Sequence, residues 1–417
     1  MVNPLPSKQA QSYALQLMES FDRSGFLDEE QTLELKHLFG HSGGQMFGVL
    51  VCHTRKGNEV VLKAFSGQFL GKWEVPGWVG PAFDTKAFEK INNEHLGQSA
   101  LVNSEEEQRK LSTTTHAALT ALYAFTTIDG QTLKVDQIPN SESWPSGTGD
   151  CCAPKLLHAA FKQDLIPVGL AEFYYGVSNS HTHKEFYPPC ENRCSLILPH
   201  LLQLHILYVD DDIVVVNKPG GLLSVPGKGA DKQDCIVNRV KLLYPNSIAQ
   251  PAVHRLDMDT SGLMVLAFTK EAHRNLSIQF IKQQVKKRYE ALVEGIIKEE
   301  QGRIELAFRY DPLTKPRQIY DPVNGSWGTT IWKRIRVESF GPEKRNVSRL
   351  ALVPITGRTH QLRLHTSSTQ GLAHPIVGDN LYGNGHTASR MMLHACELVF
   401  SHPKSKKKLI MRSEVPF

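Results

Sequence analysis

Residues 253–262 read VHRLDMDTSG and place two carboxylates next to an arginine where the chain turns. Asp257 and Asp259 are followed by Thr260-Ser261-Gly262, residue types that are common in turns, and then by the apolar strand LMVLAF. A carboxylate that an arginine keeps ionised can act as a nucleophile or general base. Spacing alone leaves Asp257 open as either a reactive carboxylate or a cap of the turn, and it favours the cap for Asp259.

The half of the chain that contains this stretch is basic. Residues 1–200 hold 16 Lys and Arg against 22 Asp and Glu, a net charge of −6. Residues 201–417 hold the remaining 31 against 20, a net charge of +11. A chain of 417 residues is too long for one ordinary core. We therefore expect an acidic domain at 1–200 and a basic domain at 201–417, with nucleic acid as the candidate partner of the basic domain.

Strands and helices alternate irregularly in both halves, which predicts an α+β fold rather than a doubly wound sheet. In the first half we expect helices over 9–21, from Asp28, over 104–123 and over 153–164, and strands within 46–67 and 167–177. In the second half we expect strands within 206–219, at 263–268, 287–295 and 349–354, and helices over 271–284 and before Gly371.

Four clusters of polar residues follow strands of the basic half: 217–220, 254–257, 287–289 and 357–363. They offer one central carboxylate, one phenol and several cationic groups. This half has no phosphate-binding glycine loop, no dinucleotide-binding glycine pattern, no Ser-His-Asp order and no metal-ligand spacing of His and Cys. Nucleotide hydrolysis and dinucleotide chemistry are therefore poorly supported.

The same clusters carry a family resemblance. HRLDMDTSG closely resembles the signature of RluA-type pseudouridine synthases, HRLD, two variable residues, then TSG. Further motifs follow in that family's order, and the resemblance covers about residues 204–417: ILYVDDDIVVVNKPGGLLSVPG, KKRYEALVEG, PITGRTHQLRLH, HPIVGDNLYG and LHACELVFSHP. The resemblance implies a mixed, mainly antiparallel sheet with a central catalytic cleft. We expect a separate α/β-type domain in the N-terminal half, which the resemblance does not cover.

The resemblance also implies roles for single residues. Asp257 matches the catalytic aspartate, Tyr289 the tyrosine that packs on the uracil face, and Arg363 the arginine that pairs with the aspartate. Arg255 resembles the arginine that helps to flip the uridine out of its stem-loop. As further substrate-binding candidates, Leu362 matches an aliphatic position under the base, and Lys218 lies in a family motif with a structural or phosphate-binding role.

By that resemblance the enzyme breaks the glycosidic bond of uridine, turns the base and rejoins it through C5, without cofactor or metal. The aspartate attacks the sugar, attacks the base or removes a sugar proton, and the sequence leaves these routes open. The expected substrate is a tRNA anticodon stem-loop, a hairpin in large-subunit rRNA, or both. A base must leave its stack for such chemistry. A non-catalytic RNA-binding factor on the same fold is the alternative, against which the intact Asp257, Tyr289 and Arg363 argue.

Composition adds an expectation about location. No apolar run approaches the roughly 18 residues of a membrane span, and the first residues, MVNPLPSKQAQ, do not have the pattern of a signal peptide. The seven cysteines fit reduced thiols. We expect a cytoplasmic, monomeric protein without membrane contact.

The acidic half contains GTGDCCAPKLLHAAF and, further on, YPPCENRC, a layout that faintly resembles zinc-dependent deaminases. The candidate zinc ligands are Cys152, Cys190 and Cys194. The glutamate of that family, two residues after the first ligand, is absent, because Pro154 follows Cys152 at that spacing and Ala153 follows Cys151. We expect a structural zinc or a degenerate deaminase fold that binds RNA, in preference to an active deaminase; buried cysteines without metal remain an open alternative.

Overall fold

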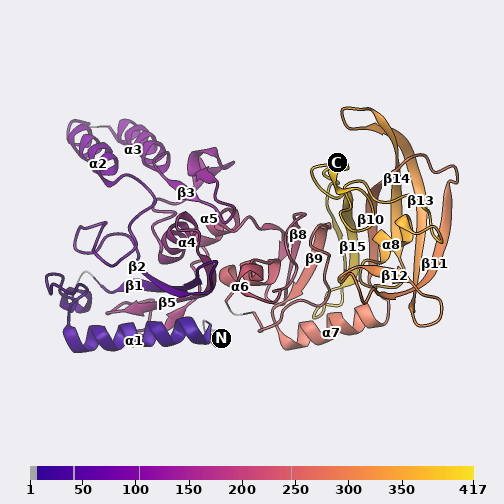
Figure 1. Cartoon of the computed structure of the whole chain (residues 1–417). Coiled ribbons are helices and arrows are strands. Elements are labelled where there is room, and N and C mark those ends of the chain that lie inside the picture. The colour runs from indigo at the N-terminus through magenta and orange to yellow at the C-terminus, as the bar shows by residue number, and fades with distance from the viewer. Residues whose placement is uncertain (1–6, 41–42, 103, 246) are drawn as a thin grey trace. The chain divides into compact units, whose positions relative to one another are not determined.

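The computed structural model shown in Figure 1 describes residues 7–40, 43–102, 104–245 and 247–417. Residues 1–6, the start of the segment in which no signal peptide is expected, lie outside the described residues. The chain forms two compact units. The N-terminal unit extends to Leu204 and includes residues 227–234 and 238–245, and the C-terminal unit contains the other described residues from His205 to Phe417. The boundary expected at residue 200 falls within helix α5, Cys194–Leu201.

The N-terminal unit is built around a four-stranded antiparallel sheet in the order β2-β1-β5-β6. Helix α1, Lys8–Ser24, covers one face, and helix α4, Cys152–Lys162, covers the other (Figure 1). Side chains alternate across a strand, so Phe47 and Val49 pack in the core under α1 while Gly48 meets α4. The strands are β1 Gln45–His53, β2 Glu59–Phe65, β5 Ile166–Tyr175 and β6 Phe186–Tyr187.

Gly48 sets how closely α4 approaches the sheet. A Cβ atom at this position would lie 2.6 Å from Cβ of Cys152, which is closer than atoms can pack. The close approach buries Cys152 in the first turn of α4. Cys151 directly precedes the helix. The orientation of the two adjacent cysteines therefore follows from this contact.

Two parts of the N-terminal unit differ from expectation. The helix predicted from Asp28 is wrong: the Asp28 carboxylate accepts the N–H groups of Thr32 and Leu33 and closes a turn, and only the 3₁₀ turn Lys36–Phe39 follows. Helix α2, Thr85–Ser99, was not predicted; it buries none of its residues. The remaining elements are α3 Glu105–Thr120, β3 Ala124–Thr126, β4 Thr132–Lys134 and two 3₁₀ turns, Val135–Gln137 and Ser141–Ser143.

The C-terminal unit is a ten-stranded sheet in the order β12-β11-β13-β14-β10-β15-β9-β8-β7, with β16 paired to β15. Every pairing is antiparallel except that of β9 with β15, which confirms the α+β prediction. The strands are β7 His205–Val209, β8 Ile213–Lys218, β9 Ser261–Ala267, β10 Lys286–Glu294, β11 Gln301–Tyr310, β12 Gln318–Tyr320, β13 Ser326–Phe340, β14 Arg345–Pro354, β15 Leu393–Ser401 and β16 Lys408–Arg412.

Helix α7, Lys270–Ile281, packs on β9, and the short helix α8, Gln361–Ser367, contacts β11, β13 and β14 (Figure 1). Helix α6, Ile236–Leu243, and the 3₁₀ turns Ala230–Lys232 and Gly385–Thr387 complete the elements of the described chain. No helix among the described residues is both long and apolar enough to cross a membrane.

Gly262, the last residue of the VHRLDMDTSG stretch, joins the two parts of the large sheet. Ser261 and Gly262 pair with His394 and Ala395 in the parallel contact of β9 with β15. Gly262 has φ +117°, and a Cβ atom there would lie 2.3 Å from the carbonyl oxygen of Ala395. Only glycine satisfies both the backbone conformation and the space. The residues that precede Gly262 are therefore held at the N-terminal end of β9.

We expect Gly262→Ala to lower the free energy of unfolding of the C-terminal unit by about 1–3 kcal/mol more than Gly221→Ala does. Gly221 is the matched control, because its φ is also positive, +83°, but no heavy atom lies within 4 Å of a Cβ placed there. Hydrogen exchange of the β9 and β15 amides at increasing urea concentration measures the difference. Equal losses in the two variants would contradict the role of the β9–β15 contact.

Candidate active site

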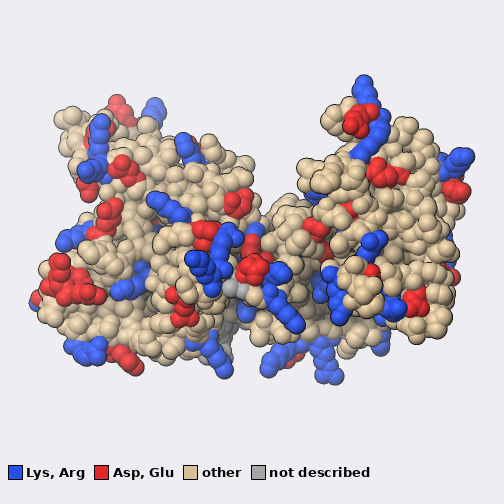
Figure 2. Space-filling view, viewed as in Figure 1, with Lys and Arg blue, Asp and Glu red and all other residues tan. Residues whose placement is uncertain are grey.

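The VHRLDMDTSG stretch lines a pocket of about 590 Å³ in the C-terminal unit. Its walls come from residues 253–257 and Thr260, from the end of α7 and the residues after it, from the start of β10 and from the segment that leads from β14 into α8. The charged residues of the lining are four cations and one carboxylate: Arg255, Lys287, Arg358, Arg363 and Asp257. Lysines and arginines are interspersed with carboxylates on the face of each unit that Figure 2 shows. The cations that line the pocket therefore indicate where an anionic ligand binds more specifically than the net charge of the unit does.

Asp257 is the carboxylate of the pocket. One of its oxygens lies 3.8 Å from an Nη atom of Arg363 and 3.9 Å from Nε2 of His360. Its side chain is 19 % exposed, and within the described part of the chain no side chain or backbone N–H hydrogen-bonds to its carboxylate. Asp259 is not part of the pocket wall. Of the two carboxylates in the stretch, only Asp257 is available to a molecule in the pocket.

Arg363 is held by a second carboxylate that sequence reasoning missed. Its Nε and Nη2 atoms donate to the two oxygens of Asp379, at 2.7 Å each, and both side chains are almost completely buried. Burial works against the charge of Arg363, but the hydrogen bonds to Asp379 outweigh it and raise the pKa of Arg363. Burial likewise opposes ionisation of Asp379, yet the bonds from Arg363 lower its pKa. The remaining Nη1 group, on the Asp257 side, is therefore a fixed cation.

His360 lines this side of the pocket, and Tyr382 packs against His360 and Arg363 outside the lining. Nδ1 of His360 lies 3.0 Å from the Tyr382 hydroxyl, and the guanidinium of Arg363 lies over the Tyr382 ring, 5.2 Å from its centre. Burial lowers the pKa of His360, although the charge of Asp257 acts in the opposite direction. Asp379 and Tyr382 both lie in HPIVGDNLYG. That motif was the available signal, but it did not show which residue would hold the arginine.

The predicted base-binding residues line the pocket near Asp257. Tyr289 stands on β10, beside an irregularity in the pairing with β15 between Arg288 and Tyr289. Burial and the charge of Asp257 raise the pKa of Tyr289, so its phenol stays protonated. Leu362, at the start of α8, is also part of the wall and is 7 % exposed. An aromatic and an aliphatic side chain in one pocket can accommodate the flat faces of a base.

The loop that carries Asp257 is fixed on both sides of Arg255. Ring atom Nε2 of His254 accepts the N–H group of Val265 at 3.1 Å, and burial lowers the pKa of His254 to about 3, so its ring is neutral. The Ser224 hydroxyl donates to the carbonyl of Leu256 at 2.6 Å and accepts its N–H group. Arg255 itself is exposed at the pocket, where it can reach a ligand.

Lys218 does not reach the pocket. It is fully buried, and its ammonium group donates to the carbonyls of Pro219, Leu222 and Met258 at 2.7–2.8 Å. These three acceptors use all three donors of a lysine. The prediction of Lys218 as a substrate-binding residue is therefore corrected: of its two expected roles, the structure gives it the structural one, which ties β8 to the loop around Met258.

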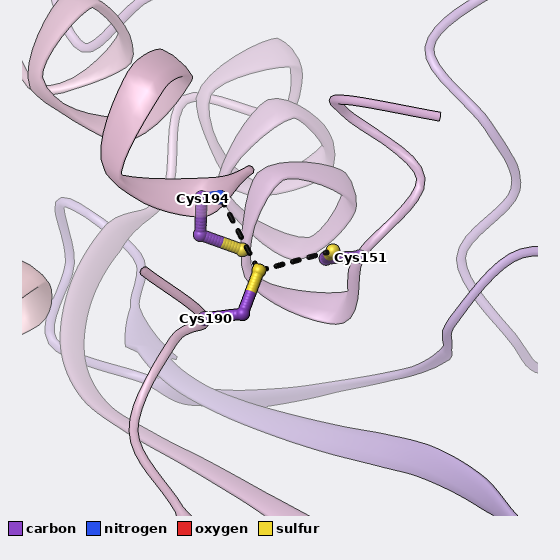
Figure 3. A group of neighbouring side chains, drawn as sticks. All are labelled: Cys151, Cys190 and Cys194. Atoms are coloured by element: carbon purple, nitrogen blue, oxygen red, sulfur yellow. Dashed lines mark hydrogen bonds between the residues drawn. The ribbon is translucent and has the colours of Figure 1, made fainter. Parts of the chain in front are cut away.

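The predicted zinc ligands also change by one residue. The sulfur atoms of Cys151, Cys190 and Cys194 all lie within 4.8 Å of one another. Figure 3 shows that the three side chains gather at one place between two helix starts. Cys152, the predicted member, is turned away and contacts the carbonyls of Met46 and Ala64 instead. The reason is the packing of Cys152 against Gly48, which directs the preceding residue toward the other two cysteines.

Known proteins share the C-terminal half. Residues 212–368 match the family model described as RNA pseudouridylate synthase. The dual-specificity RNA pseudouridine synthase RluA of Pasteurella multocida is 42% identical over 209 residues, which are 49% of this chain and 90% of that protein. The same enzyme of Escherichia coli K12 is 38% identical over 217 residues, 51% of this chain and 94% of that protein.

Among solved structures, human RNA pseudouridylate synthase domain containing 1 is 29% identical, with a TM-score of 0.43, and the match covers 51% of this chain and 84% of that one. The sequence relatives are matched over nearly their whole length, so the family assignment depends on them and on the family model. The chain belongs to the RNA pseudouridylate synthase family and is an RNA-modifying isomerase of the RluA type.

Proposed function

We propose that Asp257 is the catalytic group and that the pocket receives a uridine flipped out of a folded RNA. The surroundings of one carboxylate carry the proposal. Asp257 is the single carboxylate among the residues that line the pocket, its side-chain oxygens accept no hydrogen bond within the described chain, and a fixed arginine lies 3.8 Å away. A neighbouring cation favours the ionised form of a carboxylate. An ionised carboxylate without hydrogen bonds is free to react with the substrate.

The reaction is an isomerisation, so the product has the same composition as uridine. The bond from C1′ to N1 breaks, the uracil turns within the pocket, and a bond from C1′ to C5 forms. The hydrogen on C5 is lost and N1 gains a proton. Three routes use an ionised Asp257: attack on the sugar, attack on the base, or removal of a sugar proton. In each, the positive charge of Arg363 stabilises the carboxylate whenever it is released in ionised form.

The other pocket residues bind and orient the substrate. Tyr289 packs on the face of the uracil, and Leu362 supports the base during its turn. Arg255, exposed beside Asp257, contacts the phosphate or base next to the flipped uridine. Extrusion from a stem-loop costs a few kcal/mol, which contacts of this kind offset. No cofactor or metal is assigned to this reaction.

We further propose that the substrates are a tRNA anticodon stem-loop and a hairpin of large-subunit rRNA. The relatives at about 40% identity are dual-specificity enzymes by name, and VNKPGGLLSVPG is most similar to that subgroup. Phosphate contacts from the pocket cations supply affinity, and the shape of the loop supplies specificity. A monomer located in the cytoplasm remains the expectation for the whole protein.

For residues 1–200 we propose a structural or RNA-binding module rather than an active deaminase. Ala153 occupies the position two residues after Cys151 where a deaminase has its glutamate. The backbone at this position binds a carboxylate from another element. Glu172 of β5 is buried and accepts the N–H group of Ala153 at 2.9 Å. Glu172 thereby has a structural role at the start of α4.

We expect Asp257→Asn to lower the rate of pseudouridine formation by about 10³-fold or more and to leave RNA binding nearly unchanged. Asp259→Asn is the matched control, since this carboxylate belongs to the same loop but not to the pocket wall, and it should stay within a few-fold of the wild type. Pseudouridine mapping on an anticodon stem-loop transcript and on a large-subunit rRNA hairpin measures both variants. Full activity of Asp257→Asn would exclude the catalytic assignment. An active wild-type protein that modifies neither RNA would exclude only the substrates.

We expect Asp379→Asn to destabilise the C-terminal unit by about 3–5 kcal/mol, because it leaves the buried Arg363 without its bidentate partner. Arg363 would then pair with Asp257. This pairing should lower kcat in steady-state assays more than it raises KM. The control is Glu397→Gln, which removes the partner of the exposed Arg412 and should cost at most about 1 kcal/mol. Wild-type kcat in folded Asp379→Asn would show that Arg363 does not need this carboxylate for positioning.

We expect Arg255→Gln to weaken the binding of RNA and to reduce the slope of log Kd against log salt by about one, since one phosphate contact is lost. Arg303→Gln is the control: Arg303 is exposed on β11, pairs with Glu305 and does not line the pocket. Fluorescence anisotropy with a labelled stem-loop at several salt concentrations gives both slopes. The same slope in Arg255→Gln and in the wild type would exclude a phosphate contact.

A further inference from the structure

We propose that Cys151, Cys190 and Cys194 of the N-terminal unit form a zinc-binding site with three thiolate ligands. Their sulfur atoms lie within 4.8 Å of one another, and those of Cys151 and Cys190 are 3.8 Å apart (Figure 3). With Zn–S bonds of about 2.3 Å, two sulfurs of a tetrahedral site are about 3.8 Å apart. A disulfide needs about 2.05 Å. The observed separation fits two ligands of one metal ion.

The local fold positions all three sulfurs. Cys151 directly precedes α4, and Cys194 is the first residue of α5. Cys190 stands four residues before Cys194, and its sulfur accepts the Cys194 N–H group at 3.4 Å. The N-terminal end of a helix stabilises a thiolate. The ligands therefore come from two segments, brought together by the packing of both helices in this unit.

The cluster differs from cysteines that only fill a core. Such cysteines are usually buried and behave as small apolar groups, as Cys152 and Cys52 do here. Cys190 is exposed and Cys151 is half-buried, whereas Cys194 is buried. A metal ion can reach the site from solvent, and the buried Cys194 then holds it from the protein side.

Neighbouring side chains fix the backbone on both sides of Cys151. Asp150 accepts the hydroxyl of Tyr123 at 2.7 Å, and the buried Glu172 accepts the N–H group of Ala153 at 2.9 Å. Outer contacts of this kind orient metal ligands and raise affinity. The backbone at Cys151 is thus held in place before a metal binds, which lowers the entropic cost of forming the site.

The chemistry of the ligands selects the metal. Thiolates favour zinc over magnesium or calcium, which take oxygen ligands. Binding releases the protons of the coordinating thiols to solvent. No fourth His, Cys, Asp or Glu of the described residues belongs to the group, so water or another exchangeable ligand completes the tetrahedron. The metal site is a feature of the protein separate from pseudouridine formation, and the proposal does not rest on that activity.

The test uses the full chain, purified under reducing conditions from zinc-supplemented medium and dialysed. Elemental analysis should find about one zinc per chain, and Co²⁺ in its place should give thiolate-to-cobalt charge-transfer absorption and the visible bands of a tetrahedral site. Cys151→Ala, Cys190→Ala and Cys194→Ala should each lower zinc affinity more than about 10-fold. Cys152→Ala, the matched control one residue away, should keep both the metal and the cobalt spectrum.

Three outcomes would overturn the proposal. The wild-type chain could be free of zinc and unable to bind added Zn²⁺ while all three thiols react with a thiol reagent. Zinc could be retained with unchanged affinity in all three variants, which would place it elsewhere. Mass spectrometry could find a disulfide between Cys151 and Cys190 in protein kept reduced, which would make the group a redox pair. Pseudouridine formation by the same preparations is a separate readout, so its loss would not be confused with loss of the metal site.

Discussion

The catalytic unit depends on one buried ion pair. Arg363 is held by both oxygens of Asp379, and this leaves a single guanidinium nitrogen 3.8 Å from Asp257. Because its Nε and Nη2 atoms bind Asp379, Arg363 does not form a direct hydrogen bond to Asp257, although its positive charge lies close to that carboxylate. Without Asp379, the guanidinium of Arg363 would be free to form a direct salt bridge with Asp257. The bidentate pair with Asp379 prevents this.

The backbone around the pair of Arg363 and Asp379 also helps to hold Asp257 in position. Gly262 lets β9 pair with β15, and Lys218 and Ser224 tie the loop of Asp257 to β8 and to the segment after it. These contacts bury their polar groups with full hydrogen bonding, so the loop has little freedom. A rigid support of this kind keeps a reactive group within the small tolerance that catalysis requires. Residues that look like substrate ligands in the sequence can therefore be parts of that support, as Lys218 is.

Sequence reasoning recovered what is local and periodic. The strands β1 and β2 follow from two apolar runs separated by a turn, and the helix α1 follows from a clear apolar stripe. The motifs predicted Asp257, Tyr289 and Arg363, which line the pocket, but also Lys218, which does not. It missed Asp379, because pairing across 16 residues leaves no periodic signal. It chose Cys152 over Cys151, because the contact with Gly48 from a distant strand decides which cysteine turns outward. At Asp28, the same side-chain chemistry can start a helix or close a turn, and only the structure distinguishes them.

The most direct measurement is a crystal structure of the Asp257→Asn protein bound to a stem-loop RNA that the wild-type protein modifies. We expect the target uridine to be out of the helix, its base to lie between Tyr289 and Leu362, and its C1′ atom to be within about 4 Å of the side chain at position 257. We also expect Arg363 to keep its pair with Asp379. A uridine that remains stacked in the stem-loop, or a base bound away from position 257, would exclude a catalytic role for Asp257 in this pocket.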